Sequence, residues 1–554
     1  MDWGGRLIPF PAEYAQRYRS LGLWGTLPIA AEFQLVADRL ADCVALITDE
    51  RDLTYGELDE QADLLALGLA ELGLRPGDRV LLQVANRPTT IIAWYGILKA
   101  GLIPVCTLAA HRAHEIGGIS RRVEAVAHLV EAGMPGFDLV AFASEQQQDH
   151  PTLRHVLTVN APEGAQGTRV EDLIASADAS AARQAVARVQ AAIDPDDIAV
   201  FQLSGGTTGV PKVIPRLHAE YWYNARSFAD ASGWDETTRV AHLLPVVHNA
   251  GIACGLHAAH SAGGALVLGS AVLDQAFPLL ARAQATDILL GHAHYGAVDH
   301  PWFDQAMSSM KRVVLSGAKL PARVFEAYEQ RGIWAGQMFG MGEGFFTLST
   351  PRSTRQARLA TVGVPVSPYD EFRVLDPGTE ADAADGAVGE LVCRGPYTLR
   401  GYFDAPEQNE RAFTADGYYR TGDLVLVRDF GGEPSISVEG RIKDLINRGG
   451  EKISAEEVEF LLLQHRDVIA AAVVAMPDER LGERTCAYLV AVGQPLSMED
   501  VRGHLQALGV AKFKWPERLE WLPELPKTPV GKLDKKRLQI EIADKIAAEK
   551  AAGA

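Results

Sequence analysis

The sequence is poor in cysteine, and its cysteines lie far apart. Five occur in 554 residues and none forms a C-x-x-C pair; they are Cys43, Cys106, Cys254, Cys393 and Cys486. This spacing excludes a disulfide scaffold and the common cysteine-based zinc sites. It is typical of a reducing compartment, so it predicts a cytoplasmic protein.

Long apolar runs and a leader sequence are also missing. No uncharged apolar stretch approaches the ~18 residues that a transmembrane helix needs. The first residues, Met1 to Arg6, show neither the basic nor the apolar segment of a signal peptide. We therefore expect no membrane partner and no export.

Positive charge is in deficit. The chain has 53 basic and 71 acidic side chains, a net charge of −18. This balance argues against a nucleic-acid-coating protein and a polybasic membrane anchor, because both need positive surfaces. It does not exclude a small anionic ligand, since a few local lysines can hold one. The length predicts several domains with large cores.

Strand-like and helix-like segments alternate in the first two thirds of the chain. Strands are predicted at residues 44–48, 79–85, 103–106, 199–203, 240–244, 265–268 and 313–315, and the last four are each followed by a loop and then a helical segment. Thr54 and Glu57 form a capping box before a helix that ends at Gly73. Residues 174–192 predict an exposed helix. Such alternation predicts an α/β fold of parallel-rich sheets flanked by helices.

The pattern changes near Glu371, where short alternating runs predict a small antiparallel subdomain. A domain boundary is expected at Gly440 and Arg441. Beyond it, segments at 456–463, 470–475, 488–492 and 498–508 predict a small α/β domain. We therefore predict two domains, residues 1–440 and 441–554.

A glycine-rich loop is the strongest local signal. Residues 203–212 read Leu-Ser-Gly-Gly-Thr-Thr-Gly-Val-Pro-Lys and follow an apolar strand. Glycines let the backbone approach an anion, and amides and hydroxyls donate to phosphate oxygens. A flexible surface loop is the alternative, but the preceding strand and Lys212 favour a phosphate site. The loop is not a Walker A motif, because Val210 and Pro211 follow its last glycine.

Five motifs in order resemble those of the acyl-adenylate-forming superfamily, which includes acyl-CoA synthetases, luciferases and peptide-synthetase adenylation domains. After the loop they are Gln337–Glu343, Tyr419–Asp423, Gly440–Asp444 and Pro529–Lys532. Within the superfamily the chain is most similar to stand-alone aryl-acid adenylating enzymes of siderophore and related pathways. The residues that carry this likeness are Val213–Arg216, His248-Asn249, Arg394–Thr398 and Ile446–Glu457.

The resemblance implies a site for ATP and Mg²⁺. Phosphate-loop residues are Ser204, Gly205, Gly206, Thr207, Thr208, Gly209 and Lys212. Gly317, Ala318, Met338 and Phe339 resemble the adenine slot, and the further expected ATP-binding residues are Lys319, Gly340, Met341 and Gly342. Asp423 resembles the carboxylate that accepts the ribose hydroxyls, and Arg441 and Lys443 are also expected to bind ATP. Glu343 and Thr207 are the expected metal ligands.

The resemblance also implies domain alternation around one site. Lys532 resembles the catalytic lysine that bridges carboxylate and phosphate, and by spacing alone it would be a solvated lysine in a basic run. The small C-terminal domain would present Lys532, then rotate about Lys443 to offer a thiolation face of Gly449, Gly450 and Lys452. His248 resembles the residue where the pantetheine tunnel meets the aryl pocket; a satisfied core histidine is the alternative.

The expected aryl-acid pocket contains Asn249, Ala250, Cys254, Gly317, Gly342 and Phe346. Asn249 stands where amino-acid-activating relatives carry an Asp, and a neutral amide cannot compensate a buried ammonium. Cys254 disfavours dihydroxybenzoate, because a thiol is a poor partner for a 3-hydroxyl. Ala250 and Phe346 depart from the family pattern of Tyr or Phe and Val or Leu. We expect a substituted salicylate, a hydroxypicolinate or a bicyclic hydroxyquinaldate-like acid.

The expected activity is formation of an aryl-adenylate, then transfer to the phosphopantetheine thiol of a carrier protein acting in trans. An aryl-CoA ligase using free coenzyme A is the alternative. A non-catalytic nucleotide-binding homologue would be expected to lack Lys532, Glu343 or Asp423, and all three are present. Because carrier proteins are commonly acidic, we also expect a basic docking patch of Arg448, Lys452, Lys512 and Lys514.

Overall fold

The computed structural model describes residues 3–204, 211–317, 319–448, 451–478, 480–508, 510, 512–528 and 533–553. Contacts divide the chain into two compact units. Unit 1 comprises Met1–Glu371 and Cys393–Tyr419, and unit 2 comprises Phe372–Val392 and Arg420–Ala554. The domain boundary expected at residues 440 and 441 lies inside unit 2. It remains a prediction, about where a C-terminal domain of residues 441–554 rotates.

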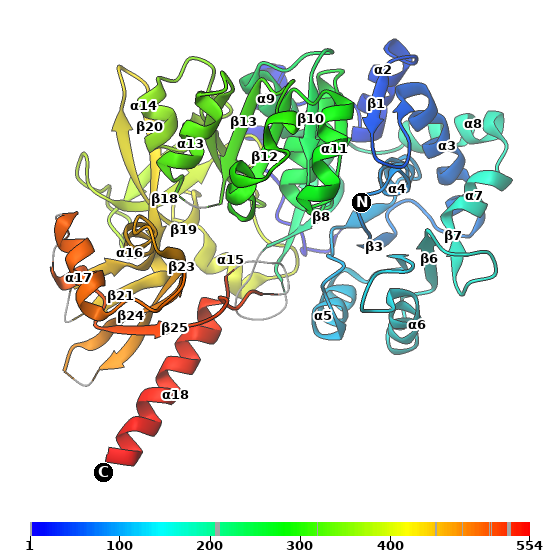
Figure 1. Cartoon of the computed structure of the whole chain (residues 1–554). Helices are drawn as coiled ribbons and strands as arrows, with labels where there is room; N and C mark the ends of the chain where they lie inside the picture. The colour runs from blue at the N-terminus through cyan, green and yellow to red at the C-terminus, as the bar shows by residue number, and fades with distance from the viewer. Residues whose placement is uncertain are drawn as a thin grey trace. The chain divides into compact units, whose positions relative to one another are not determined.

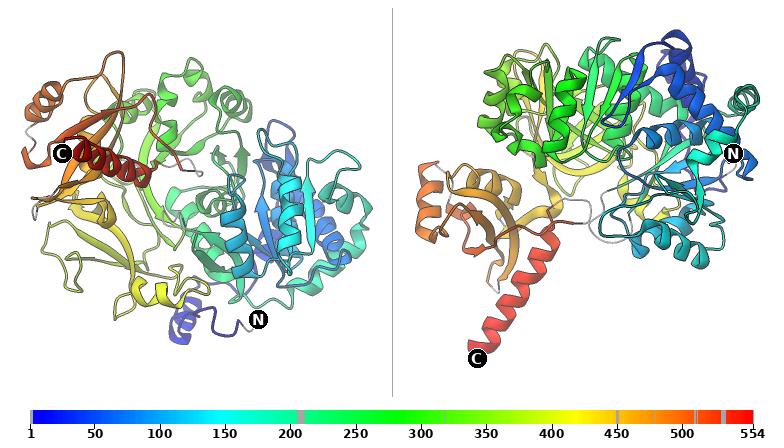
Figure 2. Two further views of the ribbon diagram at one scale, coloured as in Figure 1. Left: turned by 90° about the horizontal axis from the view of Figure 1, so that it is seen from below. Right: turned by 45° about the vertical axis from the view of Figure 1, so that its right-hand side comes forward.

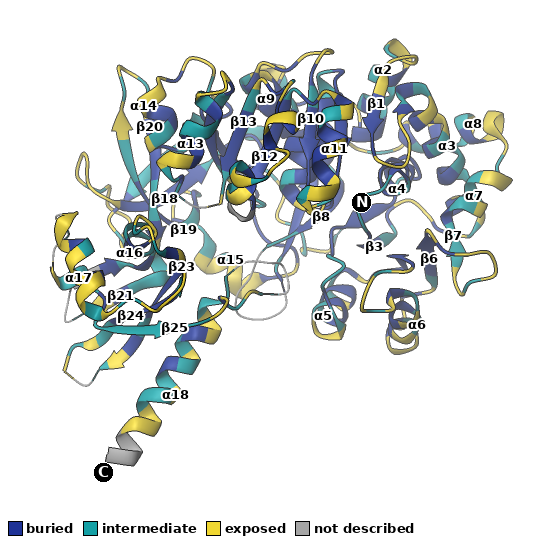
Figure 3. Cartoon of the chain, in the orientation of Figure 1, coloured by how far each residue is buried: buried dark blue, intermediate teal, exposed yellow. Residues whose placement is uncertain are grey.

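One large sheet of unit 1 is parallel at its centre. Its nine strands run in the order β16-β15-β14-β13-β12-β10-β11-β1-β2. The five neighbouring pairs between β14 and β1 in this order are all parallel. The strands are β1 (Val44–Ile47), β2 (Leu53–Thr54), β10 (Arg239–His242), β11 (Ala265–Leu268), β12 (Asp287–Gly291), β13 (Arg312–Ser316), β14 (Trp334–Met341), β15 (Phe345–Leu348) and β16 (Val364–Pro365). Figure 3 colours β10, β12 and β13 as buried, as expected for strands covered on both faces.

The second sheet of unit 1 has the order β7-β6-β5-β3-β4-β8-β9. Its strands are β3 (Arg79–Gln83), β4 (Ile103–Val105), β5 (Ala127–Glu131), β6 (His155–Val159), β7 (Thr168–Arg169), β8 (Ile198–Leu203) and β9 (Val213–Leu217). The expectation of a helix directly after the glycine-rich loop is wrong. The apolar segment β9 first returns antiparallel to β8, so the loop joins the two strands of a hairpin.

Helices pack on the faces of these sheets (Figures 1 and 2), and some of them are buried in a core that both sheets share. They are α1 (Ala12–Ser20), α2 (Ile29–Arg39), α3 (Tyr55–Glu71), α4 (Pro88–Lys99), α5 (Ala113–Val123), α6 (Leu139–Asp149), α7 (Val170–Ser176), α8 (Ala179–Gln190), α9 (His218–Ser232), the π-helix η1 (Ala250–His257), α10 (Ala258–Ser261), α11 (Leu273–Ala283), the 3-10 helix η2 (His292–Asp299), α12 (Phe303–Ala306), α13 (Ala322–Glu329), α14 (Arg355–Ala360) and α15 (Pro406–Ala412).

Local capping explains where two of these helices begin. The capping box of Thr54 and Glu57 at the start of α3 is confirmed. The single helix expected at 174–192 is instead two, α7 and α8. The break falls at Asp178, whose side chain accepts a hydrogen bond from the Ala181 amide and starts α8.

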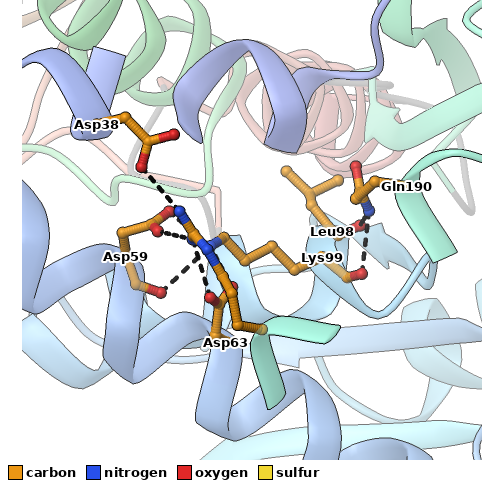
Figure 4. A network of polar contacts seen from close by, with 7 residues as sticks. Asp38, Asp59, Asp63, Leu98, Lys99 and Gln190 are labelled. Atoms are coloured by element: carbon orange, nitrogen blue, oxygen red, sulfur yellow. Dashed lines mark hydrogen bonds and ion pairs between the residues drawn. The ribbon is translucent and has the colours of Figure 1, made fainter. Parts of the chain in front are cut away.

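A buried cluster of charged side chains links four helices of unit 1 (Figure 4). The ammonium group of Lys99, on α4, is fully buried between Asp59 and Asp63 of α3. Arg183 of α8 bonds the same two carboxylates and also reaches Asp38 of α2, with 2.8 Å between Arg183 Nη2 and Asp38 Oδ1. The charges are therefore mutually paired, and they fix four helices relative to one another.

Unit 2 contains most of a four-stranded sheet, ordered β17 (Glu371–Leu375), β18 (Gly389–Arg394), β19 (Tyr419–Asp429) and β20 (Pro434–Arg441). A second sheet has the order β22-β21-β24-β23, with β25 beside β24. Its strands are β21 (Leu445–Arg448), β22 (Glu451–Ser454), β23 (Val468–Asp478), β24 (Gly482–Ala491) and β25 (Arg518–Trp521). The helices are η3 (Ile442–Asp444), α16 (Ala455–Leu462), α17 (Met498–Ala507), η4 (Lys512–Lys514) and α18 (Lys535–Gly553). Among the described residues, no helix combines the length and apolar character needed to cross a bilayer.

Candidate active site

The glycine-rich loop is closed at its base by a pair of reciprocal hydrogen bonds. The Ser204 amide donates to the Lys212 carbonyl at 3.0 Å, and the Lys212 amide donates to Ser204 Oγ at 3.1 Å. Of the predicted phosphate-loop residues, Gly205, Gly206, Thr207, Thr208 and Gly209 lie outside the described residues. The hairpin base thus fixes where the loop leaves and rejoins the sheet.

Glu343 lies at the tip of the hairpin formed by β14 and β15. Gly344 makes the turn with φ +94°, and its amide donates to the Met341 carbonyl at 3.1 Å. A side chain at Gly344 would meet the Tyr397 carbonyl oxygen at 1.8 Å, so only glycine fits. The Glu343 carbonyl in turn accepts from the Leu399 amide at 2.8 Å. The backbone on both sides of Glu343 is therefore fixed.

One buried tyrosine, Tyr402, contacts the Glu343 carboxylate, and Tyr419 and Lys212 contact that tyrosine. The Tyr402 hydroxyl donates to Glu343 Oε1 at 2.8 Å and lies 2.8 Å from the Tyr419 hydroxyl. The Lys212 ammonium lies 4.3 Å from the centre of the Tyr402 ring. Burial, followed by the charge of Glu343, raises the pKa of both phenols, so they remain neutral donors.

Arg216, on β9, connects the phosphate hairpin to the Glu343 turn. Its side chain is 0% exposed and pairs with Glu220, with 2.8 Å from Arg216 Nη2 to Glu220 Oε2. Arg216 Nη1 also donates to the Gly342 carbonyl at 3.1 Å, and Nη2 donates to the Tyr397 carbonyl at 3.3 Å. Burial lowers the pKa of Arg216, but Glu220 raises it more, so the guanidinium stays charged.

The predicted pocket residue Asn249 is buried and oriented by its neighbours. The Tyr221 hydroxyl donates to Asn249 Oδ1 at 2.8 Å, and Gln202 Nε2 donates to the Tyr221 oxygen at 3.1 Å. The Arg216 guanidinium lies 4.4 Å from the Tyr221 ring centre. One network therefore links Asn249, through Tyr221 and Arg216, to Gly342.

Three further predicted pocket residues lie on η1 and β15, whereas Gly317 and Gly342 directly follow β13 and β14. Ala250 and Cys254 are on the π-helix, a geometry often found at functional sites. Cys254 is fully buried, and burial raises the pKa of its thiol, which argues against a nucleophilic role. The Phe346 ring lies against Gly340, where an added Cβ would be 2.3 Å from the ring. Phe346 is therefore a fixed wall that packs against the β14 backbone.

The residues expected in the adenine slot, and the other ATP-binding residues predicted beside them, lie at the carboxyl ends of β13 and β14. Gly317 comes directly after β13 with φ +95°, and Lys319 is half-buried nearby. Met338, Phe339, Gly340 and Met341 end β14, with Met338 buried and Gly340 exposed. Ligands of α/β sheets bind at such strand ends. Ala318 lies outside the described residues.

His248 is exposed, and its Nδ1 lies 3.4 Å from the Ala250 amide. It is therefore not a core histidine, in contrast to the alternative considered from the sequence. The structure does not test its predicted contact with a pantetheine arm.

Asp423, Arg441 and Lys443 belong to unit 2. Asp423 and Arg441 face each other on β19 and β20, with 2.8 Å between Arg441 Nε and Asp423 Oδ1. Burial lowers the pKa of Arg441, but Asp423 and neighbouring acids raise it more. Burial and Arg441 lower the pKa of Lys443. Gly449, Gly450 and Lys532 lie outside the described residues, as does the side chain of Lys452.

The predicted basic docking patch is weaker than the sequence suggests. Arg448 pairs with Glu517 at 2.9 Å between Nη2 and Oε1, and Lys514 pairs with Glu457 at 2.6 Å between Nζ and Oε1. These pairs neutralise two of the four expected cations. Lys512 is exposed on η4.

The chemistry around Glu343 fits Mg²⁺ bound together with ATP. Among the described residues there is no cluster of three His, Cys, Asp or Glu side chains that could hold a metal alone. Mg²⁺ is commonly held by one or two carboxylates plus substrate phosphates. Glu343, beside the phosphate hairpin, can provide such a carboxylate.

Arg216, Tyr221, Tyr402 and Tyr419 were given no role from the sequence, although they hold the predicted site residues. A signal for one group exists: Arg216, Glu220 and Asn224 are spaced by four and lie in a largely apolar segment. Tyr402 offers no such signal, because its partner Glu343 is 59 residues away in the sequence.

Comparison with known proteins agrees with this geometry. The AMP-binding enzyme family matches residues 33–403, and the AMP-binding enzyme C-terminal domain matches residues 457–532. The chain is 39% identical to a salicylyl-CoA synthase / salicylate adenylyltransferase of a Streptomyces species, covering 96% of this chain and 97% of that protein. It is 37% identical to the salicyl-AMP ligase / salicyl-S-ArCP synthetase of Mycobacterium tuberculosis, covering 96% and 94%.

A solved structure extends the likeness to three dimensions. The apo structure of MbtA from Mycobacterium smegmatis superposes with a TM-score of 0.73 at 36% identity, covering 97% of this chain and 98% of that chain. The match spans both sheets of unit 1 and the smaller unit 2. With the phosphate hairpin, the Glu343 turn and the Asp423 strand in the expected order, the chain belongs to the family of AMP-binding enzymes.

Proposed function

We propose that this enzyme activates an aromatic carboxylic acid with ATP and then transfers the aryl group to a phosphopantetheine thiol on a carrier protein. The observation that carries the proposal is Asn249, a buried neutral amide at the position where an ammonium-binding carboxylate would stand in amino-acid-activating relatives. The names of the relatives, which include a salicyl-AMP ligase, support it.

In the first step, an oxygen of the substrate carboxylate attacks the α-phosphorus of ATP, and pyrophosphate leaves. Both reactants are anions, so cations must offset their repulsion. Lys212 lies at the base of the phosphate hairpin, and Lys532 is our candidate for bridging carboxylate and phosphate. Mg²⁺, held by Glu343 and Thr207, would neutralise phosphate charge.

In the second step, the pantetheine sulfur attacks the acyl carbon of the adenylate, forming a thioester and releasing AMP. The thiol proton must leave during this attack. We propose that the C-terminal domain, residues 441–554, rotates about Lys443 between the steps and exposes the face of Gly449, Gly450 and Lys452 after Lys532 withdraws. His248, which is exposed, is our candidate for the residue where the thiol enters.

The orientation of the Asn249 carboxamide narrows the choice of aromatic acid that the enzyme would accept. Its oxygen accepts from Tyr221, so its NH₂ group is the one left to meet a substrate. A donor at this place suits an acceptor ortho to the carboxylate, such as a hydroxyl oxygen or a ring nitrogen. With Ala250 small and Phe346 fixed, we propose a substituted salicylate, a hydroxypicolinate or a hydroxyquinaldate-like acid.

ATP–pyrophosphate exchange across a panel of these acids tests the assignment. We expect the fastest exchange with one of the three proposed acids, less with 2,3-dihydroxybenzoate, and little with benzoate or amino acids. Fastest turnover of 2,3-dihydroxybenzoate would contradict the pocket assignment, and exchange with no aryl acid would contradict the proposed function.

An aryl-CoA ligase is the second candidate, because one similar relative is named a salicylyl-CoA synthase. Thioester formation with free coenzyme A and with a phosphopantetheinylated carrier protein separates the two. Faster transfer to the carrier supports the first proposal. We place both reactions in the cytoplasm, on the basis of the free cysteines.

A further inference from the structure

Three side chains in unit 1 form a directional hydrogen-bond relay that ends on Glu343. Tyr402 donates its only hydroxyl proton to Glu343 Oε1 at 2.8 Å. The contact of 2.8 Å between the two phenol oxygens must then be a bond in which Tyr419 donates to Tyr402. The relay therefore runs from Tyr419 to Tyr402 to Glu343.

The relay is rigid and dry. Tyr402 is 1% exposed and Tyr419 is 7% exposed. The Tyr402 backbone is clamped by Asn409, whose Oδ1 accepts from the Tyr402 amide at 2.8 Å and whose Nδ2 donates to its carbonyl at 2.9 Å. A charge-assisted bond in such a site is stronger than one in water. The bond from Tyr402 holds one oxygen of the Glu343 carboxylate in place.

The aromatic ring of Tyr402 contacts a second charged group, the ammonium of Lys212. Lys212 Nζ lies 4.3 Å from the ring centre, within the range of a cation–π contact. One tyrosine thus contacts the carboxylate at the β14–β15 turn with its hydroxyl and the lysine of the phosphate hairpin with its ring. These two elements come from different sheets and are joined at Tyr402.

We propose that Tyr402 is a positioning residue that aligns Glu343 and Lys212 for the metal–nucleotide complex. This rests on the proposed function, in which Glu343 binds Mg²⁺. Tyr419 supports Tyr402 from behind and does not itself reach Glu343. Without the Tyr402 hydroxyl, the incoming ion itself would have to order the carboxylate. We therefore expect a loss of ion affinity and a smaller loss of reaction rate once the ion is bound.

The test compares Tyr402→Phe, Tyr419→Phe and Glu343→Gln with the wild-type chain. Mn²⁺ binding in the presence of α,β-methylene-ATP is measured by water proton relaxation, and the half-saturating Mg²⁺ concentration is measured by pyrophosphate exchange. For Tyr402→Phe we expect both constants to rise about tenfold, as loss of one charge-assisted bond implies. The exchange rate at saturating Mg²⁺ should stay within about threefold of wild type.

Tyr328→Phe is the matched control. Tyr328 is a fully buried tyrosine of α13 whose hydroxyl has no hydrogen-bond partner among the described residues. Tyr328→Phe removes the same hydroxyl oxygen as Tyr402→Phe but breaks no described hydrogen bond, so we expect no change in either constant. Tyr419→Phe should raise both by about two- to threefold, because it removes only the supporting bond.

The outcomes separate the relay from the proposed function. If Glu343→Gln weakens Mn²⁺ binding and Tyr402→Phe does not, the positioning role is wrong and Glu343 keeps its assignment. If Glu343→Gln leaves Mn²⁺ binding unchanged, the metal-ligand assignment and the relay both fail. A lower melting temperature of Tyr402→Phe with unchanged Mn²⁺ binding would make Tyr402 merely structural.

Discussion

The Tyr221 hydroxyl donates to Asn249 Oδ1 at 2.8 Å, and this single bond decides which end of the carboxamide faces a ligand. Gln202 donates to Tyr221 from behind, so the tyrosine proton is committed to Asn249. The pocket therefore offers an N–H donor, in keeping with an acid that carries an acceptor beside its carboxylate.

Tyr221→Phe should weaken binding of the aryl acid without weakening that of ATP. The variant removes one hydroxyl and keeps the ring, so Asn249 is free to rotate and its oxygen loses a partner. We expect KM for the acid to rise about tenfold, with KM for ATP within about twofold. Pyrophosphate exchange at varied acid and varied ATP measures both, and an equal rise in the two constants would contradict the assigned contact.

Asn249→Asp tests the charge of the pocket. A carboxylate here would meet the ortho acceptor of the acid, beside the substrate carboxylate, and in a buried site both would repel it. We expect kcat/KM for aryl acids to fall at least about 100-fold. An unchanged preference for aryl acids, measured in the exchange panel, would place the substrate ring elsewhere.

The fold was largely predictable because its elements carry local signals. Thr54 and Glu57 marked the start of α3, and the apolar run at 265–268 matched β11. What local pattern could not predict was long-range pairing. The strand β9 was missed because a short apolar segment after a loop suits a strand or a helix equally, and only its ladder with β8 decides.

The same distinction applies to the site. Motifs predicted Glu343 and Asn249 as site residues, but did not predict the residues that orient them. Tyr402 meets Glu343 across 59 residues, and Tyr221 meets Asn249 across 28. Such contacts depend on how two sheets come together, which no single segment encodes.

Lys532→Ala should abolish adenylation and leave ATP binding intact. The lysine is our candidate for offsetting the charge where carboxylate meets α-phosphate, and this need arises in the transition state. We expect exchange to fall at least about 100-fold, with the dissociation constant of ATP, measured by calorimetry, within about threefold. Unchanged exchange would overturn the assignment and favour a solvated lysine.

The buried ammonium of Lys99 should be critical for stability. Lys99→Met leaves Asp59 and Asp63 buried with Arg183 as their remaining charged partner. Removing one member of a buried ion cluster costs about 3–5 kcal/mol. Urea unfolding measures this loss.

An exposed ion pair provides the control for Lys99. Asp299 pairs with Arg323 at 3.0 Å, and both side chains are exposed. Asp299→Asn should cost less than about 1 kcal/mol. A similar loss in the two variants would show that burial of Lys99 adds nothing to its contribution.

Buried histidines should make the protein sensitive to acid. Burial lowers the pKa of His128 to about 3 and that of His260 to about 4, both below the ordinary 6.5. Between these values and 6.5 the unfolded chain binds protons that the folded chain does not. Folding free energy is therefore lost as the pH falls below 6.5, by about 2 kcal/mol per such histidine at pH 5.

His128→Leu isolates one of these groups. Both ring nitrogens of His128 lack hydrogen-bond partners among the described residues, so replacing the ring by an apolar side chain breaks no bond. We expect the drop in urea midpoint between pH 7 and pH 5 to shrink in this variant, because one proton-binding site of the unfolded chain is gone. Thr158→Val is the control, since its buried hydroxyl on the adjacent strand β6 also lacks a described partner but does not titrate. It should shift the midpoint equally at both pH values, and an unchanged pH dependence in His128→Leu would show that folding does not lower the pKa of this histidine.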